Sequence, residues 1–325
     1  MYLEKIVTDA VLGQAVGDAM GVPVEFLSRA RVRSLQVRDM IGCEDPMPVR
    51  SRWGQLIPRG SWSDDTSMML ASMSSFVGCG GGIDHEDQMS RFARWWRKGE
   101  YCCLDHPFGL GGNISQAMDR FAAGTPALRC GGTHVMDNGN GALMRILPFS
   151  LYCIFRDLSP EDTAAVISDA SAMTHGHSIS KMCCLIWTEF LRRIVQTGSV
   201  PLAVEHIEGL DLGSRFPPEA TDAVSFLKEG RTASLAEAEI GETGYVVDTL
   251  KTALYAMTGT SDYEASILRA IGLGYDTDTA AAVTGTAAGI LYGSEGIPER
   301  WLSVLRGKDK LTAAARDFAA CFQGS

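Results

Sequence analysis

Apolar residues recur every three or four positions along most of the chain, the spacing that gathers them on one face of an α-helix. Few stretches alternate apolar and polar residues as a half-buried strand would. The pattern predicts an all-α protein, a compact multi-helix bundle formed as a single domain over residues 1–325. Helices are expected at residues 3–20, 64–76, 85–98, 114–123, 160–173, 179–197, 217–228, 243–257, 262–271, 278–292, 298–305 and 311–322.

Some connections between these helices are long and irregular. Residues 28–60 carry three prolines and seven arginines without a helical pattern. A connection of this length in a compact domain is usually a functional loop or a lid. Residues 134–150 are interpreted as a second loop, which leads into a helix ended by Pro148.

The first predicted helix is unusually rich in small residues, including Gly13, Gly17 and Gly21. Each glycine in a helix costs about 1 kcal/mol relative to alanine. The usual compensation is close packing against another backbone, so we expect this helix to be central.

Composition narrows the class of protein further. The chain has 325 residues, of which 46% are hydrophobic, and a net charge of −10, so no nucleic-acid partner is expected. It begins with an amphipathic pattern rather than a signal peptide. The apolar run at residues 280–292 is too short and too rich in glycine and threonine to span a membrane. Nine cysteines without a C-x-x-C pair are typical of reduced thiols, so the prediction is a soluble, cytoplasmic protein.

Two helix starts far apart in the sequence share an unusual combination of hydroxyls and acids. One is Ser63-Asp64-Asp65-Thr66 and the other is Asp276-Thr277-Asp278-Thr279. A single Asp, Ser or Thr side chain is enough to cap a helix N-terminus. Capping therefore explains one oxygen in each segment and leaves the second acid unexplained.

If the two helix starts meet in the fold, four carboxylates share one pocket. Two like charges about 4 Å apart repel by roughly 4 kcal/mol near a protein surface, whereas a helix N-terminus stabilises each acid by only about 0.3–1 kcal/mol. Repulsion therefore exceeds the gain unless cations lie among the acids. Hard oxygen ligands without a thiolate pair favour Mg²⁺ or Mn²⁺ over Zn²⁺.

Three weaker signals also have ordinary structural explanations. Asp18 and Glu25 lie near the C-terminal end of the first helix, as functional acids or as an exposed pair. The glycine-rich segment 138–145 either brings backbone N–H groups to an anionic ligand or forms a plain turn. His175 and His177 lack the further ligands of a zinc site, which favours a hydrogen-bonding role.

Together, these motifs resemble the ADP-ribosylglycohydrolase family. The matching segments follow one another along the chain: Gly17-Asp18-Ala19-Met20-Gly21 through Glu25-Phe26, Trp62-Ser63-Asp64-Asp65-Thr66, Gly139-Asn140-Gly141 through Met144-Arg145, Thr174-His175, and Gly274 through Thr279. Any one of these motifs alone is weak, whereas five in order are specific.

The resemblance implies a compact all-α fold with two divalent cations, Mg²⁺ or Mn²⁺, that hydrolyses the N- or O-glycosidic bond of ADP-ribose. Two sets of metal ligands are implied by position, Ser63 with Asp64 and Asp65, and Asp276 with Asp278 and Thr279. Glu25 matches a glutamate that takes part in metal binding or catalysis in some members. Implied substrate-binding residues are Asn138, Gly139, Asn140, Gly141 and His175, with Tyr275 placed to stack on or border the adenosine.

One departure from the family pattern concerns the acceptor. Arginine-specific members carry Phe-Asp-Ile-Gly in the loop before the third helix, where the Asp is a catalytic candidate. The matching segment here is Phe108-Gly109-Leu110-Gly111, which lacks the acid. Either Asp105, from the same loop, fills that space, or Glu25 is the working base, as in the serine-type members. Both are retained as catalytic candidates.

The expected function is a metal-dependent hydrolase that reverses mono-ADP-ribosylation, with arginine slightly preferred as the acceptor. Its partners would be an ADP-ribosylated protein or an ADP-ribose conjugate, and an ADP-ribosyltransferase or its target. One alternative is a non-catalytic, immunity-type protein that binds ADP-ribose or a toxin, which Gly109 favours and the complete metal set disfavours. Others are a hydrolase of a small ADP-ribose conjugate, and a helical scaffold with capped termini.

Overall fold

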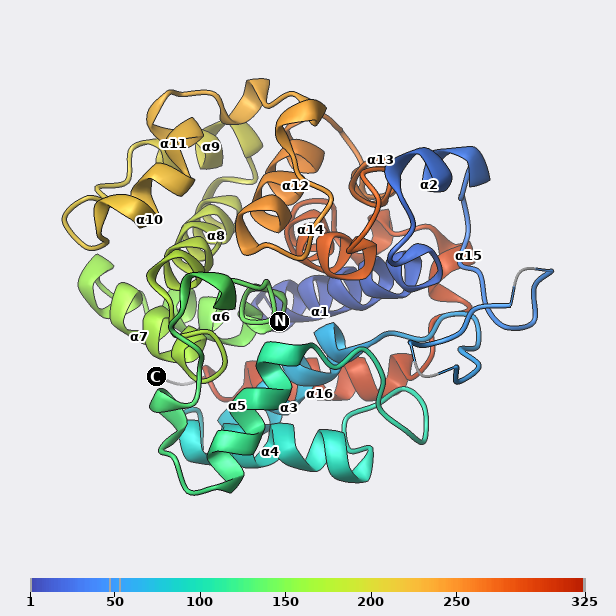
Figure 1. Ribbon diagram of the computed structural model, residues 1–325, viewed down its shortest axis with the longest axis horizontal. Helices are drawn as coiled ribbons and strands as arrows, with labels where there is room; N and C mark the ends of the chain where they lie inside the picture. The colour runs from blue at the N-terminus through green and yellow to red at the C-terminus, as the bar shows by residue number, and fades with distance from the viewer. Residues whose placement is uncertain (1, 47, 53, 324–325) are drawn as a thin grey trace.

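The computed structural model describes residues 2–46, 48–52 and 54–323 (Figure 1). These residues contain isolated β-bridges but no strand, and the all-α prediction is confirmed. The longer helices are α1 (Tyr2–Gly21), α3 (Asp64–Gly78), α4 (His85–Lys98), α5 (Gly112–Ala122), α6 (Leu147–Phe155), α7 (Pro160–Ala172), α8 (Ser178–Thr197), α9 (Val200–Glu208), α12 (Val246–Thr258), α13 (Tyr263–Ile271), α14 (Thr277–Tyr292) and α16 (Lys308–Ala320). Shorter helices are α2 (Arg29–Leu35), α10 (Pro218–Ala223), α11 (Ser225–Lys228) and α15 (Glu299–Leu302).

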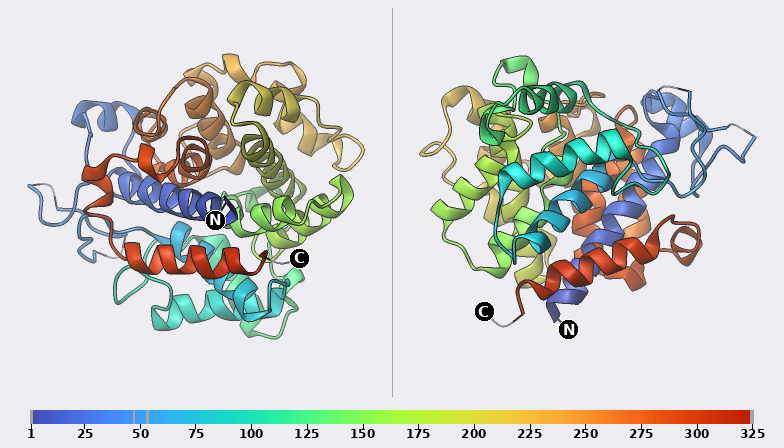
Figure 2. Two further views of the ribbon diagram at one scale, coloured as in Figure 1. Left: turned by 180° about the vertical axis from the view of Figure 1, so that it is seen from behind. Right: turned by 90° about the horizontal axis from the view of Figure 1, so that it is seen from below.

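Helices α1 and α14 pack against each other through the middle of the bundle, with α16 on the other side of α1 (Figures 1 and 2). Their backbones are so close that a Cβ added at Gly13, Gly17 or Gly21 would lie within 3.0 Å of α14 backbone atoms. The two helices are antiparallel, because Gly13 faces Gly285 whereas Gly21 faces Thr277. The prediction that the glycine-rich first helix is central is confirmed.

This antiparallel contact brings the C-terminal end of α1 to the N-terminal end of α14. The Thr277 hydroxyl closes the contact by donating to the backbone carbonyl of Gly21 at 2.8 Å. Helix α3 begins at the same place, because Asp18 of α1 accepts hydrogen bonds from the backbone N–H groups of Ser63 and Thr66. Three helix ends therefore converge on one point of the bundle.

The structure corrects several predicted elements. Residues 28–60 are not wholly irregular, because Ser28 caps the helix α2 and residues 49–52 pair with residues 54–57 as a small hairpin, with a bridge between Arg50 and Leu56. Pro148 does not end a helix; it lies in the first turn of α6, where its missing N–H group costs nothing. The predicted helix 217–228 breaks at Val224 into α10 and α11.

Two further differences lie at segments with weak periodicity. Helix α9 was not predicted, although Ser199 caps it and Pro201 stands in its first turn, both ordinary start signals. Helix α15 is shorter than the predicted 298–305 segment. Within the described residues, no helix is both long and apolar enough to cross a lipid bilayer.

Candidate metal and substrate site

Six carboxylates gather where the ends of α1, α3 and α14 meet. Oxygen atoms of Asp18, Asp65 and Asp278 lie within 4.8 Å of one another, and so do oxygen atoms of Glu25, Asp276 and Asp278. Asp278 belongs to both groups, so the two groups are adjacent. The sixth acid, Asp64, lines the cavity beside them. The structure thus brings together both acid-rich helix starts, together with Glu25.

The carboxylates are held in an environment that opposes their charge. Burial, followed by the charge of Asp18, raises the pKa of Asp64 to about 8, and burial raises the pKa of Asp18 to about 6. The pKa values of Asp65 and Asp278 are raised well above the usual range, first by burial and then by neighbouring acids. Among the described residues, none of the six carboxylates forms an ion pair with a basic side chain. The nearest basic side chain is that of Arg52, whose charge lowers the pKa of Glu25 without forming an ion pair with it.

The donors present fit a hard divalent cation. The Oδ1 atom of Asp65 is buried without a hydrogen-bond partner among the described residues. All the ligand atoms in the two acidic groups are carboxylate oxygens, with no His nitrogen or Cys sulfur among them. Oxygen-only donor sets suit Mg²⁺ or Mn²⁺ rather than Zn²⁺. Cations bound between the acids would also remove their mutual repulsion.

The hydroxyl residues of the predicted metal set lie beside these acids. Ser63 is buried, and its Oγ donates to Asp65 Oδ2 at 2.9 Å. The backbone N–H of Thr279 donates to Asp278 Oδ1 at 2.9 Å, and its side chain lines the cavity. The Thr279 side chain also hydrogen-bonds Asp276, so both hydroxyl residues contact acids of the cluster.

A cavity of about 340 Å³ opens above the acidic cluster. Asp64, Asp276 and Asp278 line it, together with Gly139, Asn140, Gly141 and His175. Asn140 connects its own loop to α12 and to the start of α14, because its Nδ2 donates to Thr249 Oγ1 at 2.9 Å and to Asp276 Oδ2 at 2.7 Å. Asn138 does not line the cavity, and its side chain holds the loop by bonding Val135 and Ser180.

His175 presents a neutral ring to the cavity. Burial, and then the charge of Arg145, lowers its pKa to about 3. The His175 Nδ1 atom lies 2.9 Å from Thr174 Oγ1, which also accepts a hydrogen bond from Arg145. Arginine has only donors, so the Thr174 hydrogen is available to Nδ1, and the remaining His175 proton is then on Nε2. Nε2 faces Gly139, where it can donate to a ligand oxygen.

Two aromatic side chains form the rim of the cavity. Phe26 and Tyr275 are exposed, and their rings meet edge to face with centroids 5.7 Å apart. Both residues have a φ of +62°, which is strained for a side chain of this size. Backbone hydrogen bonds from Phe26 to Tyr275 and from Tyr275 to Leu27 keep the two residues in this conformation. Such backbone strain frequently accompanies ligand sites.

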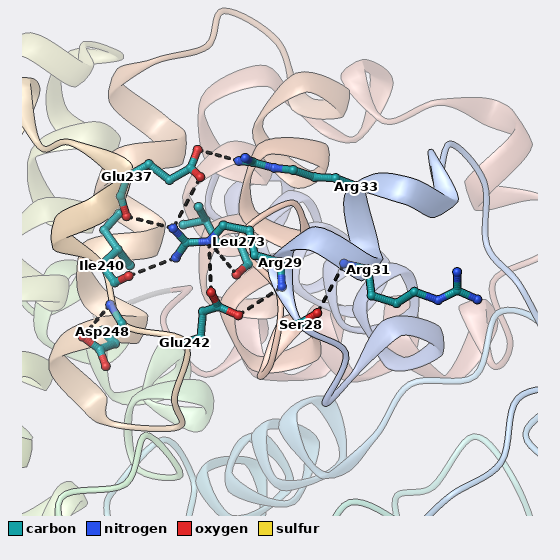
Figure 3. A network of polar contacts seen from close by, with 10 residues as sticks. Ser28, Arg29, Arg31, Arg33, Glu237, Ile240, Glu242, Asp248 and Leu273 are labelled. Atoms are coloured by element: carbon teal, nitrogen blue, oxygen red, sulfur yellow. Dashed lines mark hydrogen bonds and ion pairs between the residues drawn. The ribbon is translucent and has the colours of Figure 1, made fainter.

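Arg29 of α2 fixes the segment that carries Tyr275 (Figure 3). Its guanidinium group donates to the carbonyl oxygens of Leu273 at 3.2 Å and Ile240 at 2.9 Å. The guanidinium group also donates to the carbonyl oxygen and the carboxylate of Glu237. The backbone N–H of Arg29 donates to the carboxylate of Glu242. The connection that precedes α12 is therefore attached to the loop before α14.

The loop before α5 does not bring Asp105 to the cavity. The Asp105 side chain is 95% exposed and bonds His106 Nδ1 at 2.6 Å. Gly109 lines the cavity instead, with φ +93°, and an added Cβ would lie within 3.0 Å of Asp64. The backbone of Gly109 thus occupies the space beside Asp64, and no side chain fits there without displacing that acid.

Sequence reasoning left several residues out of the site. Asp18 was noticed as a possible functional acid, but its contact with the start of α3 depends on the packing of α1. Gln14 holds the same region, because its Nε2 donates to the carbonyls of Asp65 and Met144. Phe26 and Arg52 line the cavity from irregular segments that carry no periodic signal, and Asn113 lines it from the first turn of α5. For Phe26 the only sequence signal was its position next to Glu25.

Comparison with known proteins identifies the family. The family model for ADP-ribosylglycohydrolase matches residues 2–325. The chain is 32% identical over 307 residues to the ADP-ribosylarginine hydrolase Tri1 of Serratia proteamaculans, covering 94% of this chain and 76% of that protein. It is 28% identical over 298 residues to the ADP-ribosyl-[dinitrogen reductase] glycohydrolase of Rhodospirillum rubrum, covering 91% of this chain and 88% of that protein.

A solved structure agrees with these sequence matches. An ADP-ribosylglycohydrolase-related protein complex contains a chain with a TM-score of 0.74 and 28% sequence identity. The match covers 98% of this chain and 99% of that one. The resemblance inferred from the five motifs is confirmed, and the chain belongs to the ADP-ribosylglycohydrolase family.

Proposed function

We propose that this protein is a hydrolase that cleaves the glycosidic bond between ADP-ribose and a protein side chain, reversing mono-ADP-ribosylation. The observation that best supports this proposal is the pair of carboxylate groups that share Asp278 at the base of the cavity. Similarity to the ADP-ribosylarginine hydrolase Tri1 supports arginine as the preferred acceptor, and similarity to the ADP-ribosyl-[dinitrogen reductase] glycohydrolase supports a modified protein as the substrate. We further propose a cytoplasmic location and an ADP-ribosyltransferase that modifies the same target.

Two divalent cations, Mg²⁺ or Mn²⁺, are proposed to bind in this site. Ser63, Asp64 and Asp65 would hold one of them, and Asp276, Asp278 and Thr279 the other. When bound, such ions supply positive charge that polarises hydroxyl groups and water. A carboxylate oxygen of Asp18 lies within 4.8 Å of oxygens of Asp65 and Asp278, so Asp18 could share a cation with them. Its hydrogen bonds to the start of α3 favour a positioning role instead.

Glu25 is the proposed general base. It lies against Asp276 and Asp278 and also lines the open part of the cavity, where a water can reach it. Burial, followed by the charges of Asp276 and Asp64, raises its pKa well above the usual range, and the nearby Arg52 opposes that shift. Cations bound to the neighbouring acids would offset their negative charge and lower the pKa of Glu25. Glu25 would then be ionised and could take a proton from water.

The remaining walls are proposed to hold the ADP-ribose group. The Asn138–Gly141 loop would contact oxygens of the diphosphate or ribose through Gly139 and Gly141, which line the cavity, because the Asn140 backbone N–H already donates to Gly244. His175 Nε2 offers one further donor for the same oxygens. Phe26 and Tyr275 offer flat faces for the adenosine at the rim. Their strained conformations are maintained by backbone hydrogen bonds, so the stacking surface is present before a ligand binds.

The proposal is tested with matched peptides that carry ADP-ribose on arginine or on serine, each assayed with Mg²⁺ and with EDTA. Metal-dependent release of ADP-ribose is expected, faster from arginine. Asp276→Asn should retain the fold and lose activity to below about 1% of wild type, because a charge that contacts the cation is removed. Near-full activity of that variant with Mg²⁺ present would contradict the metal assignment.

A non-catalytic binder of ADP-ribose, or a hydrolase of a small conjugate, is the second candidate. The observation that favours it is the absence of an acid at Gly109, with Asp105 turned to solvent. Calorimetry with free ADP-ribose separates these functions from the first one. Tight binding together with no release from either peptide would favour the second candidate.

A further inference from the structure

A second hollow adjoins the candidate site. Its volume is about 340 Å³, and it shares Glu25, Phe26, Ser51 and Arg52 with the cavity above the acidic cluster. Beyond these shared residues, its polar lining includes Arg31 of α2 and Arg50 of the hairpin that pairs residues 49–52 with 54–57. We call this hollow the arginine groove. Glu25, at the boundary, is the one acid among its described lining residues.

The hairpin carries two of these arginines, Arg50 and Arg52, and Arg52 lies near Glu25. Backbone hydrogen bonds join Ile57 to Val49 at 3.0 Å and Ser51 to Gln55 at 2.9 Å. The Arg50 side chain is held along the hairpin, because its Nη1 donates to the carbonyl of Gly54 at 2.9 Å. No acid lies within salt-bridge distance of Arg50 or Arg52 among the described residues. Neither guanidinium group forms an ion pair there, although Arg52 lies near enough to Glu25 to oppose the rise in the pKa of that acid.

Helix α2 separates its arginines by direction. Arg29 and Arg33 point toward Glu237 and pair with it, whereas Arg31 extends the opposite way (Figure 3). The acids of the 237–242 segment are thus engaged on the far side of α2 from Arg31. In a chain with a net charge of −10, the groove is a local concentration of positive charge. Such a concentration attracts anionic partners.

The groove lies on the acceptor side of the proposed reaction centre. The loop Gly139–Gly141 and His175 line the cavity but not the groove, whereas Glu25 and Arg52 line both. With ADP-ribose against the loop and Glu25 beside the bond that breaks, the departing side chain leaves past Glu25. The protein segment that carries this side chain then follows the groove.

We propose that the arginine groove binds acidic side chains that flank the modified residue, so that the preferred substrates are ADP-ribosylated proteins with an acidic segment at the modification site. This inference rests on the proposed function, since it assigns the acceptor side of the same site. Charge complementarity at an exposed groove chiefly increases the rate of association and is weakened by salt.

The test uses two ADP-ribosyl-arginine peptides that differ only in their flanks, with aspartate and glutamate in one and lysine in the other. Free ADP-ribosyl-arginine serves as a substrate that cannot reach the groove. For the wild-type enzyme at low salt, we expect kcat/KM to be about tenfold higher for the acidic peptide. This ratio should fall toward one at high ionic strength because the charges are screened.

The Arg31→Glu/Arg50→Glu variant reverses two charges of the groove and leaves Arg52 in place. Its ratio between the acidic and the basic peptide should fall below one. Arg31→Gln/Arg50→Gln removes the charges without adding acids and should bring the ratio near one. The matched control, Arg129→Glu/Lys228→Glu, makes the same change of charge at exposed positions outside both hollows and should keep the wild-type ratio.

The outcomes separate the two proposals. If free ADP-ribosyl-arginine and both peptides are left intact, the proposed function fails. If free ADP-ribosyl-arginine is cleaved but wild type shows no preference for the acidic flanks, the groove assignment is overturned. A preference that persists in the charge-reversed variant, at the level of the control, overturns it as well.

Discussion

The carboxylate of Asp18 accepts two hydrogen bonds from Thr66, one from the backbone N–H at 3.1 Å and one from the hydroxyl at 2.7 Å. It also accepts from the backbone N–H of Ser63 at 2.9 Å. An acid of α1 therefore satisfies the free N–H groups at the start of α3 and sets the position of Asp64 and Asp65. The geometry of the site depends on this contact between helices.

Asp18→Asn should weaken cation binding without abolishing it. The amide retains one acceptor oxygen, so the start of α3 loses part of its support while the other acids stay in place. Loss of a residue that orients metal ligands commonly costs 10–100-fold in affinity or activity. Activity measured against Mn²⁺ concentration should show a midpoint raised by about that factor and recovery at high metal.

Asp9→Asn is the control for Asp18→Asn. Asp9 is also a buried acid of α1, but it bonds Lys5 and the backbone of Ser294, away from the acidic cluster. It should leave the metal midpoint at the wild-type value. Equal shifts in the two variants would indicate a general loss of stability rather than a positioning role for Asp18.

Asp278→Asn should disrupt both cation positions, because Asp278 belongs to both carboxylate groups. Titration calorimetry with Mn²⁺ is expected to give two sites in wild type and neither at comparable affinity in the variant. Cations at 100 times their dissociation constant stabilise a protein by about 2.7 kcal/mol per site, so Tm should rise with metal in wild type alone. Asp105→Asn, at an exposed acid outside the cluster, is the control and should bind both cations as wild type does. Loss of a cation in this control would contradict the assignment of the cations to the acidic cluster.

Gly109→Ala should reduce turnover strongly. The new Cβ would fall within 3.0 Å of Asp64, and the φ of +93° is unfavourable for alanine. Asp64 must move, so we expect kcat/KM to fall by more than tenfold. Gly111→Ala, in the same loop with open space around it and φ −75°, should cost less. A Gly109→Asp variant with increased activity on ADP-ribosyl-arginine would show instead that the site can accept the acid.

His175→Gln should make the protein less sensitive to acid. The pKa of His175 is about 3 in the folded state, below the ordinary value of 6.5 that applies after unfolding. Below pH 6.5 the unfolded state binds a proton that the folded state does not, so stability is lost as pH falls. At pH 5 this amounts to about 2 kcal/mol. Denaturant unfolding in Mg²⁺ at pH 7.5 and pH 5.0 should show a smaller loss in the variant, and equal losses would refute the explanation.

The acids of the site could be predicted because each helix start shows its excess carboxylate locally. The pattern Asp276-Thr277-Asp278-Thr279 contains more oxygens than a cap uses, and that excess is visible without the fold. The support provided by Asp18 was not visible in this way. It requires that α1 lie antiparallel to α14, and the glycines of α1 predicted a close neighbour without saying which helix it was.

The irregular segments were harder to interpret for a physical reason. Which way Asp105 or Gly109 points depends on loop dihedral angles that a hydrophobic pattern does not encode. Likewise, the scatter of arginines at 28–60 gave no sign that Arg29 would fix the loop before α14, while Arg52 lines the cavity and Arg50 lines the groove beside it. Pro148 was misinterpreted because proline ends a helix in one context and begins one in another.

The close contact between Gly17 and Ala281 has a consequence for how the protein folds. Helices α1 and α14, whose ends meet at the acidic cluster, are separated by more than two hundred residues of chain, so their pairing closes a very large loop. Contacts of this kind form late, after the locally connected helices between them have collapsed. We therefore expect the acidic cluster to assemble at the end of folding, and a chain trapped before that step would be helical but would lack the assembled cluster.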